Sequence, residues 1–89
     1  MEDEHRDILR DHGPNIIRDL EPNNILPHLG RVLTEKEVAE IKAQSTRQDR
    51  CVKLLEILPR KGPFAFTKLV YALDKEADHL ALELIKAGN

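Results

Sequence analysis

Apolar residues near the start of the chain recur at the spacing of one helix face. Over residues 3–20 these positions are Ile8, Leu9, Ile16, Ile17 and Leu20, which predicts a first helix with a single buried stripe. Gly13-Pro14 interrupts the segment. Because proline has no amide hydrogen to donate, we predict that this helix is kinked or split at that point.

A brief second helix is predicted after Glu21-Pro22. Asn23 is a residue type that caps helices, and Pro27 would lie in or near the first turn, where proline is tolerated. Gly30 is expected to end the helix. The apolar side chains of this segment are Ile25, Leu26 and Leu29.

Two threonines mark the next helix starts. Thr34 followed by Glu37 matches a capping box, in which each side chain bonds the other residue's amide, so a third helix should begin at Glu35. Thr46 followed by Asp49 repeats the pattern and should begin a fourth helix. The expected buried residues are Val38 and Ile41 in the third helix, and Val52, Leu54, Leu55 and Leu58 in the fourth.

Two further helical segments follow the break at Pro59 and Gly62-Pro63. The fifth helix is predicted to bury Phe64, Phe66, Leu69, Val70 and Leu73, and the sixth, starting after Asp74 or Glu76, to bury Leu80, Leu84 and Ile85. Short connections join all six segments. We therefore predict an all-α bundle that forms one domain over residues 1–89.

Composition supports helices packed by aliphatic residues, since aromatic residues make up only 3% of the chain and charged residues 34%. The formal net charge of −2 favours neither a nucleic acid nor a membrane surface as a partner. The one cysteine, Cys51, excludes an internal disulfide and lies in an apolar pattern typical of a buried structural thiol. The acidic N-terminus shows no signal peptide, so we expect a cytoplasmic protein.

Residue types that could carry chemistry lack the spacing that chemistry needs. The four histidines lie on three predicted helices without the pairing of a zinc motif, and they are His5, His12, His28 and His79. Glu35 and Glu37 are two residues apart and so point in different directions on a helix. We therefore expect no catalytic residue, no metal and no cofactor.

Several motifs resemble those of a known family. The run from Ile57 to Phe66, Ile-Leu-Pro-Arg-Lys-Gly-Pro-Phe-Ala-Phe, resembles the helix 4 to helix 5 signature of caspase-recruitment domains. Residues 32–35 and 40–44 are similar to the helix 3 region of these domains, and Ile8-Leu9-Arg10 fits their first helix. Within the family the chain is most similar to the domains of initiator-caspase prodomains and of RAIDD-type adaptors.

The resemblance implies the antiparallel six-helix Greek-key bundle of the death fold. It also implies binding to the same type of domain in a caspase or an adaptor, which activates the caspase by proximity in apoptotic or inflammatory signalling. The chain would then be no enzyme itself, although it could be the non-catalytic prodomain of one. The alternative is a self-assembling or inhibitory domain that polymerises, or blocks assembly, without recruiting an enzyme. Both need the same adhesive surfaces, so the sequence does not choose between them.

Charge is unevenly distributed along the chain. Residues 44–63 carry five basic side chains against two acidic ones, a local net charge of +3, and Arg47, Arg50 and Lys53 share one stripe of the predicted fourth helix. We expect this stripe to be exposed, so that reversing its charges leaves stability nearly unchanged. The alternative is that these charged side chains only keep exposed helix faces hydrated and bind no partner.

The resemblance extends this stripe into a binding face. It implies a basic patch on helices 1 and 4, which adds Arg6 and Arg10 as candidates. That patch would meet an acidic patch on helices 2 and 3 of a partner. The acidic candidates in this chain are Glu21, Glu35, Glu37 and Glu40.

Overall fold

Six α-helices and two short 3-10 helices make up the fold, seen in a computed structural model that describes residues 1–88. The α-helices are α1 (Asp3–Asp19), α2 (Pro22–Ile25), α3 (Glu35–Lys42), α4 (Arg47–Ile57), α5 (Ala65–Glu76) and α6 (Asp78–Ala87). The 3-10 helix η1 (Leu26–Leu29) continues α2, and η2 (Leu58–Arg60) continues α4. The described residues contain no strand, which confirms the all-α prediction. The predicted domain ends on Asn89, which lies outside the described residues.

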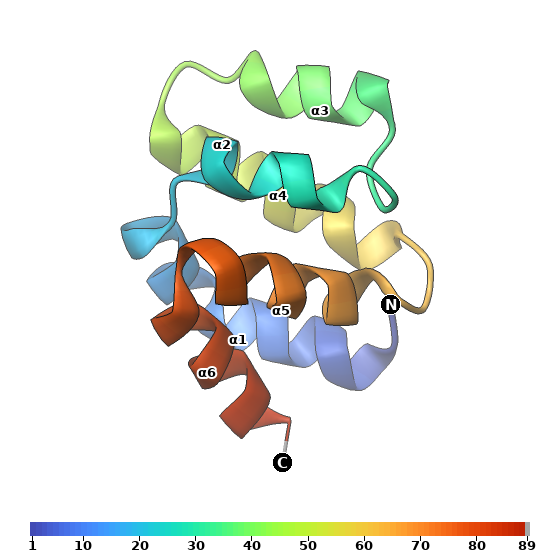
Figure 1. Ribbon diagram of the computed structural model, residues 1–89, viewed down its shortest axis with the longest axis vertical. Coiled ribbons are helices and arrows are strands. Elements are labelled where there is room, and N and C mark those ends of the chain that lie inside the picture. The colour runs from blue at the N-terminus through green and yellow to red at the C-terminus, as the bar shows by residue number, and fades with distance from the viewer. Residues whose placement is uncertain (89) are drawn as a thin grey trace.

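The helices form an antiparallel bundle (Figure 1). Helices α1, α3 and α5 run in one direction, and α2 and α4 run in the other. Helix α1 packs against α4 and α6 rather than against α2, which follows it in the chain, and α5 packs against both α6 and α2. This non-sequential pairing of antiparallel helices is the Greek-key arrangement of the death fold, as predicted.

Helix α1 is not split at Gly13-Pro14. It continues as one helix of 17 residues with Pro14 inside it. Proline removes a single backbone hydrogen bond, and Pro14 is exposed, whereas Ile8, Leu9 and Ile16 are buried on both sides of the expected break. Burial of this stripe against α4 and α6 therefore outweighs the local loss of one hydrogen bond.

The helix starts follow local capping chemistry, with one correction. The Thr34 hydroxyl accepts from the Glu37 amide at 3.1 Å, and the Glu37 carboxylate accepts from the Thr34 amide at 2.9 Å, which confirms the capping box. The Thr46 hydroxyl accepts from the Asp49 amide at 3.0 Å. Asn23 is not the cap: α2 starts at Pro22, two residues earlier than predicted, and the Glu21 carboxylate accepts from the Asn23 amide at 3.2 Å.

The core is aliphatic and contains no charged or polar residue among the described ones. Its largest buried side chains, apart from Pro22, are Ile16, Leu20, Ile25, Leu29, Ile41, Leu54, Leu58, Leu69, Leu73, Leu80 and Leu84. Cys51 is also buried, as predicted. These residues come from every helix, so the short helices stabilise one another through a shared interior.

Several predicted core residues lie at the surface instead. Val52 is 40% exposed because α4 turns Leu54 and Ile57 inward, and Leu55 is only half-buried. Phe64 is 72% exposed, since it stands at the N-cap of α5 rather than inside the helix. Ile85 is exposed on α6. The helical periodicity was therefore predicted correctly, but the prediction assigned too many residues at the edges of each helix face to the core.

Candidate functional site

Arg47, the first residue of the predicted basic stripe, is a structural arginine. It begins α4, and its Nη1 donates to the carbonyl oxygens of Ile17 at 2.6 Å and Leu20 at 2.8 Å. These carbonyls lie at the C-terminal end of α1, where backbone acceptors lack helical partners and the helix dipole favours a cation. Arg47 therefore fastens the start of α4 to the end of α1.

Arg50 is similarly turned inward. Its side chain is only 17% exposed, and its Nη2 lies 3.4 Å from the Glu21 carboxylate while its Nη1 donates to the Gln44 carbonyl at 3.3 Å. The expectation that the Arg50 side chain is exposed is therefore wrong, because these contacts link α4 to the N-terminus of α2. Glu21, an acidic candidate, consequently lies beside the basic residues and not with the acidic side chains of α3.

The remaining basic candidates lie nearer the surface. Arg10 is 71% exposed and is paired with Asp7 at 3.2 Å on its own helix. Arg6 is exposed, and its Nε donates to the Pro59 carbonyl at 3.0 Å, which joins α1 to η2. Lys53 is partly exposed on α4, with a carboxylate of Glu56 at 3.9 Å. Because α1 and α4 pack directly together, these three cations come from adjacent helices.

The acidic candidates also include residues that make contacts between elements and residues that lie nearer the surface. Glu37 closes the capping box and also contacts the Lys61 ammonium at 2.7 Å, so its carboxylate links α3 to the turn before α5. The hydrogen bond from Lys61 is the main cause that lowers the pKa of Glu37. Glu35 is exposed and Glu40 is half-buried. At about 100° per residue these two side chains lie roughly 140° apart around α3, so they do not form one acidic surface.

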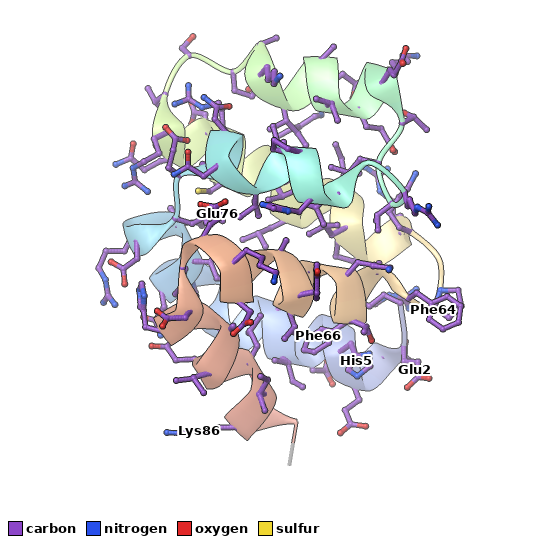
Figure 2. All side chains as sticks on the ribbon, in the orientation of Figure 1. Glu2, His5, Phe64, Phe66, Glu76 and Lys86 are labelled. Carbon is purple, nitrogen blue, oxygen red and sulfur yellow. The ribbon has the colours of Figure 1, made fainter. Side chains whose placement is uncertain are left out.

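The histidines and the cysteine have separate structural contacts. The His5 ring stacks on Phe66 with centroids 4.1 Å apart, a contact between α1 and α5 that Figure 2 shows. The His28 Nε2 atom lies 3.1 Å from a carboxylate oxygen of Glu76. Cys51 is buried, and this burial raises the pKa of its thiol. His12 on α1 lies near the Glu83 carboxylate of α6, and His79 on α6 lies near the Asp19 carboxylate of α1. Within residues 1–88, no three potential ligands gather as a metal site would require.

A further exposed surface lies on α5 and was missed by sequence reasoning, which assigned Phe64 to the core. Figure 2 shows Phe64 projecting from the edge of the molecule, whereas Phe66 lies against His5. Tyr71, two turns farther along the same face of α5, is 56% exposed. The signal that could have identified this surface is the position of Phe64 directly after Gly62-Pro63, before the helix begins.

The fold and the charged surface together define the class of protein domain to which this chain belongs. An antiparallel six-helix bundle with an aliphatic core and with charged surfaces on several helices is an interaction domain of the death fold. A family model described as CARD, caspase recruitment domain, matches residues 6–87. The match covers nearly the whole chain, so the chain belongs to the caspase recruitment domain family. Members of this family act as non-catalytic modules in homotypic protein contacts of death-fold signalling.

None of the helices described in residues 1–88 has both the length and the apolar character that crossing a membrane requires.

Proposed function

We propose that this domain recruits a caspase or a caspase adaptor through contact between two caspase recruitment domains, in apoptotic or inflammatory signalling in the cytoplasm. The observation that carries the proposal is the family match over residues 6–87. Recruitment concentrates the bound caspase, and proximity then activates it. The domain itself supplies adhesion and no catalytic group.

The docking face on this chain is the surface shared by α1 and α4, with Arg6, Arg10 and Lys53 as its cations. Arg10 and Lys53 are the test positions, because their ion pairs stay within their own helices and their removal leaves the contacts between helices intact. We leave Arg47 and Arg50 out of this face, because their guanidinium groups already bind the α1 and α2 termini. The complementary face belongs to the partner and carries carboxylates. Several such pairs steer association and select the partner, whereas a lone exposed pair is worth only ~0–1 kcal/mol.

The test is calorimetric titration of the domain with a panel of purified caspase recruitment domains from caspase prodomains and adaptors. At least one is expected to bind, and Arg10→Glu with Lys53→Glu should weaken that binding at least about tenfold. The matched control reverses two exposed lysines on other helices, Lys42→Glu with Lys86→Glu, and should retain affinity. Circular dichroism melting verifies that both variants are folded.

Two results would contradict the proposal. If no caspase or adaptor domain bound while the chain polymerised by itself, the domain would be a self-assembling one. If a partner bound and the folded Arg10→Glu, Lys53→Glu variant retained full affinity, the α1/α4 surface would not be the docking face.

A further inference from the structure

Exposed aromatic and basic side chains alternate along the outer face of α5. Phe64, Lys68, Tyr71 and Lys75 are four, three and four residues apart, which places them on one stripe of the helix. All four are exposed. We call these residues the α5 stripe. At 1.5 Å per residue the stripe is roughly 16 Å long, or about three helical turns.

The positive charges of the α5 stripe are not neutralised within the molecule. Among residues 1–88, neither Lys68 nor Lys75 forms an ion pair, in contrast to Arg10 or Lys61. The Lys75 ammonium instead lies 5.0 Å from the centre of the Tyr71 ring, a cation–π contact that keeps the lysine on the stripe. Asp74 is exposed at the edge of the stripe rather than on it.

A hollow of about 270 Å³ lies at the Phe64 end of the stripe. Val32, Pro63, Phe64 and Ala65 supply its apolar lining, and Arg31 and Lys68 supply two cations. Arg31 is exposed and also makes no ion pair among the described residues. An apolar hollow beside two cations that make no ion pair within residues 1–88 suits an aliphatic side chain with carboxylates next to it.

We infer that the α5 stripe and this hollow form a second docking surface, whose partner is an acidic amphipathic helix of another protein. Charge complementarity identifies the partner, because Arg31, Lys68 and Lys75 make no ion pair with any described residue, in a chain with a net charge of −2. The straight stripe of three turns matches a second helix lying alongside it. A leucine-like residue of that helix enters the hollow, and carboxylates spaced by one turn meet the cations.

This surface is separate from the α1/α4 face and does not depend on the proposed function. In Figure 1, α5 crosses the front of the bundle and α4 lies behind α2. A protein helix is a better occupant than a nucleic acid, because only two aromatic rings are available and both stand on a convex helix beside Asp74. A phosphate backbone would find no groove to follow on this convex surface.

The experiment uses a designed peptide helix of about five turns with glutamates at i, i+4 and i+7 beside a leucine stripe. A scrambled peptide of the same composition, with its glutamates distributed around the helix, is the control probe. Titration of the isotope-labelled domain by nuclear magnetic resonance should shift the amide signals of Arg31 and of residues 64–75 most. Only the patterned peptide should produce this footprint at moderate salt.

Variants then test the named side chains. Lys68→Glu with Lys75→Glu, and separately Phe64→Ala, should each weaken the peptide at least about tenfold, as measured by fluorescence anisotropy. The control Lys42→Glu with Lys86→Glu has the same charge change and should alter affinity less than about twofold. A peptide footprint on α1 and α4, or unchanged binding by folded stripe variants, would overturn the inference. Tighter binding of a single-stranded RNA at this face, or self-association that requires Phe64, would overturn it in favour of those occupants.

Discussion

Replacing Arg47 by alanine should destabilise the fold, although the sequence predicts an exposed binding residue at this position. The substitution removes two charge-assisted hydrogen bonds, to the carbonyls of Ile17 and Leu20. Each such bond contributes about 1.5–3 kcal/mol when its acceptor is left without a partner. Arg47 is only partly buried, so water can reach the freed carbonyls, and we expect a total loss of about 1.5–3 kcal/mol. That loss is a large share of a stability of roughly 5–15 kcal/mol.

Urea unfolding followed by circular dichroism measures this loss. With a slope of about 1–2 kcal/mol per M, the midpoint of the Arg47→Ala variant should fall by roughly 0.8–3 M. Arg10→Ala deletes the same side chain from an exposed site and should change the free energy of unfolding by no more than about 0.5 kcal/mol. Equal midpoints for Arg47→Ala and Arg10→Ala would refute the structural role assigned to Arg47.

Three further predictions concern the core, the thiol and an acid-sensitive contact. Leu54→Ala should lower the free energy of unfolding by about 2–5 kcal/mol, whereas Val52→Ala on the exposed side of α4 should lower it by less than about 1 kcal/mol. Denaturant titrations measure both losses, and losses of similar size would show that the register of α4 is wrong. Because Cys51 is buried and its thiol pKa is raised, Ellman's reagent should label it only after unfolding, and Cys51→Ser should bind partners normally in its folded fraction; rapid labelling of native protein would contradict this. The folded pKa of Glu37 is lowered, so its contribution is fully present above its ordinary value of 4.5 and is lost as pH falls through the folded pKa. Wild type should therefore melt higher than Glu37→Gln near neutral pH, and this advantage should shrink below about pH 4.5; a gap independent of pH would contradict the role of the Lys61 contact.

Local chemistry made the helix starts predictable from sequence. Thr34 and Glu37 satisfy each other's amides whatever the rest of the chain does, so the start of α3 could be located to the residue. At the start of α4 only half of this device forms: the Thr46 hydroxyl accepts from the Asp49 amide, but the return bond of a full capping box is not made. The prediction that Asn23 caps α2 was wrong because Glu21, two residues earlier, supplies the cap that starts α2 at Pro22.

The surface roles could not be predicted because they depend on which elements meet in space. Arg47 and Arg50 have the same spacing as an exposed basic stripe, but the end of α1 and the start of α2 lie next to the start of α4 and bind both guanidinium groups. Pro14 would kink or break an isolated helix, yet burial of apolar residues on both sides of it keeps α1 continuous. Phe64 differs from Phe66 only in lying just before the first turn of α5.

The proposed docking of α1 and α4 on an acidic partner face is tested most directly by a charge-swap cycle. Arg10→Glu with Lys53→Glu is titrated against the caspase recruitment domain identified in the panel, and against a version of that partner whose docking carboxylates are replaced by lysines. Each single-sided reversal should weaken binding at least about tenfold, and combining the two should restore most of the lost affinity. Losses that simply add, with no recovery in the doubly reversed complex, would contradict direct contact between these surfaces.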